Sequence, residues 1–287
     1  MSFELYKITQ ACWQGDYWEH LAVVKELILN STSPQNPILN TNIPHAFFSP
    51  YSLLVAETGK LFQWNAAQSL YFYSIFNLIF FILSVMFFCK QVFPENFIKM
   101  SCWSLVLILF FWGYHPTDWS GFYNFYSFHL VAPYPSTFSI IITLFLLGFY
   151  YSNKKNNLIA VIFAIIFNSV VWITHPTTAI FLNLGIGIIF LVKILNDKTY
   201  FRKEFFLLIL NLLIPILLAT AWPYYPFLEL FTSNNTDFQN DSSYLYVDFI
   251  KKYWILFPSI IYFYLNKKDA IVQFLFLFSI TIAAIII

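Results

Sequence analysis

Hydrophobic runs fill the chain from about residue 67 to Ile287, and the short polar breaks between them alternate in charge. One set of breaks carries lysine and arginine: Lys90 and Lys99, then Lys154 and Lys155, then Lys193, Lys198, Arg202 and Lys203, then Lys267 and Lys268. The breaks at 115–137 and 175–178 carry none, and the break at 223–252 carries Lys251 and Lys252 only at its end. Cytoplasmic loops of membrane proteins are enriched in lysine and arginine. The alternation therefore predicts a chain that crosses a membrane repeatedly, with the lysine-bearing breaks on the cytoplasmic side.

The composition agrees with a membrane protein. Hydrophobic residues make up 59% of the chain and charged residues 10%, against roughly 25% charged residues in an average soluble domain. A net charge of +1 without a basic patch gives no indication of a nucleic-acid partner. Because a span needs about 17–25 apolar residues, we expect about eight spans, at 69–88, 98–114, 137–152, 157–174, 177–194, 205–222, 253–265 and 270–287.

The sequence therefore predicts an all-α integral membrane protein with two parts. Residues 1–66 are expected to form an outer-face loop with surface helices, and residues 67–287 a polytopic transmembrane domain. No apolar span precedes the outer loop, and the chain stops inside an apolar run at Ile287. Either the chain inserts with its N-terminus outside, or it is a fragment of a longer protein, which we favour. We expect the membrane to be a bacterial plasma membrane.

The predicted topology gathers titratable side chains on the non-cytoplasmic side. All five histidines lie there, together with most of the acidic residues: His20, His45, His115, His129 and His175, and Glu4, Asp16, Glu19, Glu26, Glu57, Asp118, Glu229, Asp237, Asp241 and Asp248. We therefore look for candidate catalytic and binding residues in the outer segments.

The first outer segment contains an amphipathic stretch from Tyr17 to Leu29, whose apolar residues recur at helical spacing. Such a helix suits a position along the membrane surface. Asp16 is placed to cap it, and Glu19 to support its first turn. Alternatively, Asp16 and His20 are four residues apart on one face, where a carboxylate can orient an imidazole.

Other outer histidines have two readings each. His45 is either an exposed loop residue or lies over a cavity mouth, before a second amphipathic helix that Pro50 would start. His175 is either a turn residue at the interface or a functional residue at membrane depth.

The aromatic-rich loop that holds His115, Asp118 and His129 suits either sugar stacking or packing on lipid headgroups. These three residues and Asp16 are also of the types that bind a divalent metal, although no short spacing requires one.

Residues 15–85 resemble the first outer loop and following span of the GT-C glycosyltransferases. The likeness rests on Asp16 opening a surface helix, the run from His45 through Ser49-Pro50-Tyr51-Ser52 to Ala56, a Gly59-Lys-Leu-Phe, an Asn65-Ala-Ala and the long span after it. These membrane enzymes use polyprenyl-phosphate sugars and include protein O-mannosyltransferases and the lipid A aminoarabinose transferase. In that family an acidic residue at the start of the loop is the catalytic base.

The resemblance implies that Asp16 is the base, with Glu19 as the second candidate. From their place in the outer segments, we expect substrate binding by His20, His45, His115, Asp118, His129 and His175. In such a site, His20, His45 or His115 would either orient the base or contact the donor phosphate. This chain departs from the family in having Asp16-Tyr-Trp-Glu19 in place of an Asp-Glu pair, and in lacking both an arginine before the span and the first transmembrane helix.

Other functions remain open. A transporter or flippase predicts charged residues or repeats inside the spans, whereas Asn168, Asn211 and Pro215 are the main interruptions here. A polymerase or ligase of the O-antigen type would need outer arginines, and Arg202 lies on the predicted cytoplasmic side. The last alternative is a non-catalytic membrane scaffold. The acceptor and the sugar are not identified by the sequence.

Overall fold

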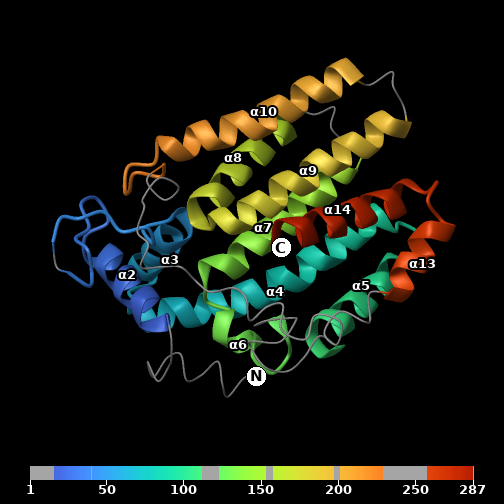
Figure 1. Ribbon diagram of the computed structural model, residues 1–287. Helices are drawn as coiled ribbons and strands as arrows, with labels where there is room; N and C mark the ends of the chain where they lie inside the picture. The colour runs from blue at the N-terminus through green and yellow to red at the C-terminus, as the bar shows by residue number, and fades with distance from the viewer. Residues whose placement is uncertain are drawn as a thin grey trace.

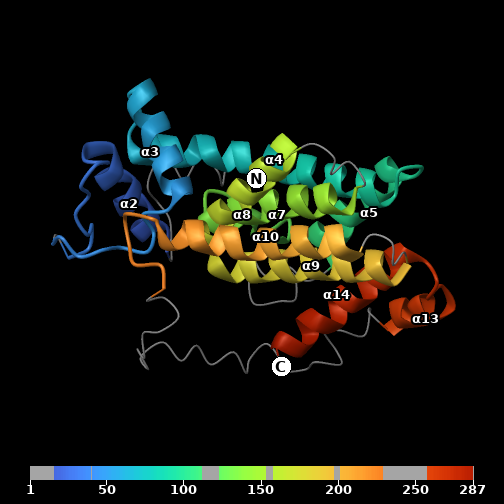
Figure 2. The ribbon, with the colours of Figure 1, turned by 90° about the horizontal axis from the view of Figure 1, so that it is seen from above.

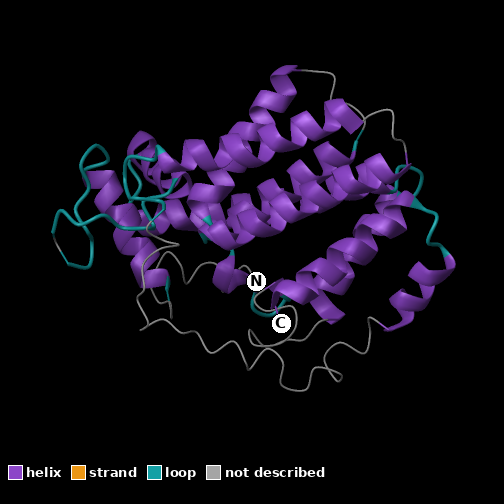
Figure 3. Cartoon of the chain, turned by 45° about the horizontal axis from the view of Figure 1, so that its top comes forward, coloured by secondary structure: helices purple, strands orange, loops and turns teal. Residues whose placement is uncertain are grey.

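Helices are the regular elements throughout the part of the chain that the computed structural model describes, which comprises residues 16–39, 41–111, 123–152, 158–196, 201–228 and 257–286 (Figure 3). The all-α prediction is therefore confirmed for these residues. The elements are α2 (Tyr17–Leu29), α3 (Pro50–Phe62), α4 (Ala66–Val92), α5 (Phe97–Val106), the π-helix η1 (Leu107–Phe111), α6 (Phe128–Val131), α7 (Pro135–Tyr151), α8 (Leu158–Thr174), α9 (Pro176–Asn196), α10 (Phe201–Thr220), α13 (Phe257–Leu265) and α14 (Ala270–Ile286).

A sharp joint between α3 and α4 is encoded locally. Helix α3 ends at Gln63, which adopts the left-handed conformation with φ of 57° and is followed by a hydrogen bond from the Trp64 N–H to the Gly59 carbonyl, 2.8 Å long. Helix α4 then starts at once, because Asn65 and Gln68 each accept a hydrogen bond from the other's backbone N–H, forming a capping box. The direction of the chain into the long helix α4 is thereby fixed within three residues.

The long helices pack side by side in a bundle (Figure 1). Helix α4 lies along α7 and also contacts α5, while α8, α9 and α10 pack against one another and α14 lies on α9. One core joins α2, α3 and α4 to the start of α7, and a second joins the rest of α7 to α8, α9, α10 and α14. Helices α2 and α3 pack together at one end of the bundle (Figure 2).

Each predicted span in the transmembrane part overlaps a helix of the structure. Among the described residues, two helices are long and apolar enough to cross a membrane on length and composition: α4 with 27 residues and α9 with 21. At 1.5 Å per residue they measure about 40 and 32 Å, against about 30 Å for the hydrocarbon core of a bilayer. Among the other apolar helices, α7 and α8 have 17 residues each and measure about 26 Å.

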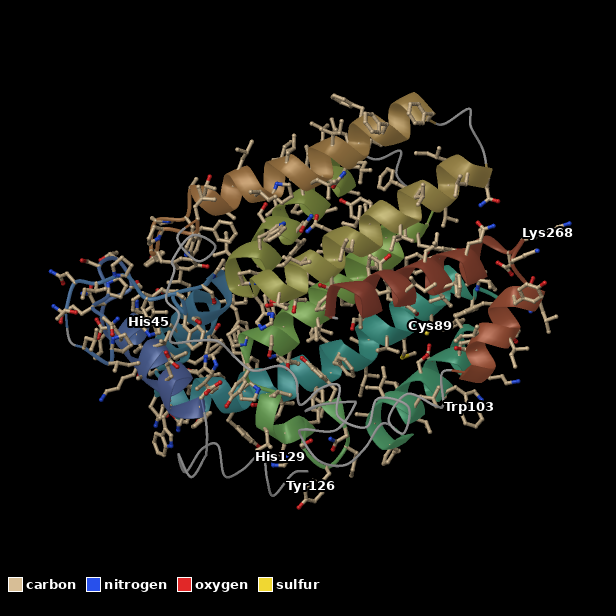
Figure 4. All side chains as sticks on the ribbon, viewed as in Figure 1. His45, Cys89, Trp103, Tyr126, His129 and Lys268 are labelled. Carbon is tan, nitrogen blue, oxygen red and sulfur yellow. The ribbon has the colours of Figure 1, made fainter. Side chains whose placement is uncertain are left out.

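The lysines of three polar breaks lie at one end of the bundle. Lys90 and Lys193 lie in the last turns of α4 and α9, and Lys268 lies in the turn between α13 and α14. Figure 4 shows Lys268 at the end opposite to His45, which lies beside α2 and α3. The helix directions thus bring the lysines of the described breaks to one end, as the alternation of breaks requires.

A buried amide network crosses the second core. The Pro215 ring lacks an N–H, so the carbonyl of Asn211 one turn earlier has no helical donor. The Asn168 amide donates to that carbonyl at 3.1 Å and also exchanges hydrogen bonds of 3.0 and 3.1 Å with Asn183. The Tyr150 hydroxyl donates to the Asn211 side chain. These side chains therefore satisfy one another's hydrogen bonds and supply a donor to the carbonyl that the proline leaves unpaired within α10.

Candidate functional site

Glu19 and His45 form a carboxylate–imidazole pair at the end of the bundle where α2 and α3 pack. Oε1 of Glu19, in the first turn of α2, lies 3.2 Å from Nε2 of His45, in the loop before α3. The His45 side chain is 10% exposed and that of Glu19 34% exposed. The imidazole is thus enclosed, while the carboxyl group remains open to an incoming molecule.

The turn that carries His45 fixes its tautomer. The backbone N–H of Phe47 donates to Nδ1 of His45 at 3.2 Å, and the N–H of Phe48 donates to the His45 carbonyl at 3.0 Å. Because Nδ1 accepts a hydrogen bond, the proton of the neutral ring is assigned to Nε2, which donates it to Glu19.

The electrostatic environment of the pair disfavours charge on both partners. Burial and then the nearby Asp16 raise the pKa of Glu19, and burial lowers the pKa of His45. A carboxylate with a raised pKa is a stronger base than one in water. The arrangement therefore offers a partly desolvated carboxylate held by a neutral donor.

His20 lies in the protein interior rather than at the surface. Its ring stacks on Phe47 with centroids 4.7 Å apart and packs on Tyr134 at 4.5 Å, leaving the residue 7% exposed. Burial, and then His45, lower the pKa of His20 to about 4. The geometry thus places His20 as a neutral packing residue that joins α2 to the start of α7.

Asp16 occupies the N-cap position of α2, as expected, but its side chain makes no capping hydrogen bond. Its backbone carbonyl accepts the N–H groups of Glu19 and His20, each at 3.1 Å. In the described part of the chain, the carboxylate that contacts an imidazole is Glu19, with His45. The sequence had instead placed Asp16 beside His20. Asp16 itself is exposed and lies near enough to Glu19 to affect its pKa.

Segments distant in the sequence hold the loop between α2 and α3. The indole of Trp222, just after α10, donates to the Phe48 carbonyl at 2.8 Å, and the Tyr224 hydroxyl donates to the Ser31 carbonyl at 2.7 Å. The Tyr51 hydroxyl donates to the Pro133 carbonyl at 2.7 Å, before α7. The sequence does not predict these hydrogen bonds of Trp222 and Tyr51, because nothing local to either residue indicates its partner.

The remaining predicted site residues lie away from the pair of Glu19 and His45, or outside the described residues. His175 accepts the Thr178 N–H at 3.3 Å and pairs with the Thr178 hydroxyl at 2.8 Å, so it caps α9. His129 lies on α6, away from His45 (Figure 4). His115 and Asp118 lie outside the described residues. Within the described ranges, no three histidine, cysteine or acidic side chains come together as a metal site.

Comparison with known proteins gives no further assignment, since no family model, curated protein or solved structure matches this chain.

Proposed function

We propose that the chain is a multi-pass membrane protein crossed by about eight helices. In the described part of the chain, exposed apolar side chains follow α4, α8 and α10 at spacings of mostly three and four residues: Phe72, Ile75, Ile79, Ile82 and Leu83; Leu158, Ile162, Phe163, Ile166 and Phe167; Phe205, Phe206, Ile209, Leu213, Leu217 and Leu218. Exposed apolar surface of this extent is unfavourable in water and marks an interaction surface. Lipid covers it in the proposed arrangement, and the shorter helices are accommodated by tilt or local thinning of the bilayer.

The proposed activity is transfer of a sugar from a polyprenyl-phosphate carrier to an acceptor on the non-cytoplasmic side. The observation that carries it is the partly desolvated Glu19 carboxyl, held by His45 at the end of the bundle opposite to Lys90, Lys193 and Lys268. The resemblance of residues 15–85 to the GT-C glycosyltransferases supplies the reaction class. The proposed site lies where a lipid-linked donor can present its headgroup above the membrane.

In the proposed reaction, Glu19 removes the proton from the acceptor hydroxyl as general base. The acceptor oxygen forms a bond to the anomeric carbon as the bond from that carbon to the carrier phosphate breaks. The polyprenyl phosphate leaves with the bonding electrons, and the sugar inverts its configuration. The structure thus favours Glu19 over Asp16 as the base, with Asp16 as the second carboxylate.

The test measures transfer of radiolabelled sugar by membranes that contain the full-length protein, using a panel of polyprenyl-phosphate sugars as donors. Glu19→Gln is expected to lower kcat by about 10²–10⁴-fold, the usual contribution of a general base, and Asp16→Asn by less. Glu57→Gln is the matched control, because Glu57 is an exposed carboxylate on α3 that pairs with Lys60 at 2.9 Å. Undiminished transfer by the Glu19 variant would exclude it as the base, and no transfer from any donor by the unmodified protein would exclude the function.

A further inference from the structure

His45 uses both of its ring nitrogens inside the protein. Nδ1 accepts the Phe47 N–H, and Nε2 faces Oε1 of Glu19, each at 3.2 Å. A histidine with both nitrogens engaged has no free atom with which to take a proton from a substrate or to contact a phosphate. A direct contact between His45 and the substrate, one of the roles expected from the sequence, therefore does not match this geometry.

We propose that His45 is a positioning residue for Glu19: its Nε2–H fixes Oε1, which leaves Oε2 as the atom that receives the proton of the acceptor. This inference rests on the proposed function and adds a second residue to it. His45 changes neither protonation state nor partner during the reaction. Its contribution is to hold the carboxylate in one rotamer, so that the base is oriented before the acceptor arrives.

Aromatic contacts restrict the orientation of the His45 ring. The ring packs against Phe47 and Phe48, with centroids 5.6 Å away in each case. Phe48 is 1% exposed, and its carbonyl is held by the indole of Trp222. The turn is therefore anchored from α10, and the direction of the Nε2–H bond is set by contacts that do not involve Glu19.

Two substitutions separate the roles of the two nitrogens. In His45→Gln the side-chain N–H₂ can replace Nε2–H as the donor to Glu19, whereas in His45→Asn the shorter carbonyl can replace Nδ1 as the acceptor of the Phe47 N–H. A positioning role predicts that the Gln variant retains kcat within about threefold of the unmodified protein, and that the Asn variant loses about 10–100-fold, a part of the general-base contribution. KM is expected to stay unchanged in both, because the substrate does not contact His45.

The opposite ranking, with His45→Asn active and His45→Gln inactive, would overturn the proposal, since a merely structural turn residue needs only the Nδ1 contact. A second readout is a combined variant. Adding His45→Asn to Glu19→Gln is expected to cause no further loss of kcat, because residues that act as a unit are not additive. An additional loss equal to that of the single His45→Asn variant would also overturn it.

Nitrogen-15 NMR of histidine-labelled protein tests the pair without any activity. The expected spectrum has Nδ1 of His45 unprotonated and Nε2 protonated at neutral pH, with the Nε2 signal shifted in Glu19→Gln. The reversed tautomer overturns the proposal even if the enzyme is active. The expected tautomer in a protein that transfers no sugar from any donor would instead overturn the proposed function, and with it the catalytic meaning of the pair.

Discussion

His20 shows how burial changes what a histidine can do. It follows Glu19 directly in the sequence, yet its ring is enclosed by Phe47 and Tyr134 and its pKa is lowered to about 4, whereas Glu19 reaches the surface. Neighbouring positions on α2 therefore separate into one buried packing residue and one partly exposed carboxyl group, because the helix turns about 100° between them.

The lowered pKa of His20 predicts a loss of stability in acid. Between its ordinary value of 6.5 and about 4, the unfolded chain binds a proton at this position and the folded chain does not, so the free energy of unfolding falls as pH falls through this window. The full shift corresponds to on the order of 3 kcal/mol. In His20→Phe, which preserves ring packing, we expect a smaller fall in melting temperature between pH 7 and pH 4.5 than in the unmodified protein in the same detergent. An equal fall in both proteins would show that His20 does not titrate as described.

At the scale of the elements, the proline inside α10 and the amides of α8 and α9 are linked. Pro215 removes a donor from α10, and Asn168 supplies one from α8 to the same carbonyl. If α10 lies in a membrane, this carbonyl has no water to bond, so the Asn168 amide is the donor that satisfies it there.

This dependence predicts a coupling between two substitutions. Asn168→Ala is expected to destabilise the protein by about 1–2 kcal/mol, since it leaves the Asn211 carbonyl and the Asn183 amide without their partner. In a Pro215→Ala background the loss is expected to be smaller, because the restored N–H of residue 215 bonds the Asn211 carbonyl within α10. Asn196→Ala, an exposed amide at the end of α9, serves as control. Equal losses in both backgrounds, measured by thermal unfolding, would refute the coupling.

Local patterns in the sequence predict elements but not the contacts between them. The apolar spacing from Tyr17 to Leu29 predicts α2 with the bounds that the structure has, and the apolar runs predict the long helices. The pair of Glu19 and His45 could not be predicted in the same way, because an irregular loop separates them and no period relates their positions. Asn168 and Asn211 were visible as interruptions of the spans, whereas the hydrogen bonds of Asn168 to Asn183 and to the Asn211 carbonyl depend on how three helices pack.

At the scale of the whole molecule, the two ends of the bundle differ in chemistry. One end carries Glu19 and His45, and the other carries Lys90, Lys193 and Lys268. The lysines of α2 and α3 are exceptions, and Lys60 among them is paired, with Glu57 and with the Ser31 hydroxyl. If the bundle spans a membrane, the two ends lie on opposite sides.

Labelling of single introduced cysteines tests this orientation. Gln35 and Lys268 are both exposed. The Gln35 N–H donates to the side chain of Glu26 on α2, and Lys268 lies at the end of the bundle opposite to His45 (Figure 4). In intact cells, a membrane-impermeant maleimide is expected to label Gln35→Cys above the background of the parent protein, and to label Lys268→Cys only after permeabilisation. Labelling of both in intact cells would contradict a membrane between the two ends, and the reverse pattern would contradict the assigned direction.

The bond from Trp222 to the Phe48 carbonyl also sets an order of events during biosynthesis. Its two partners are 174 residues apart in the chain, and at ribosomal rates of about 5–20 residues per second the second partner is made roughly 10 to 35 s after the first. During that interval the loop between α2 and α3 lacks its hydrogen bond to Trp222. The surroundings of His45 are therefore completed only late in translation, after α4 to α10 have been synthesised.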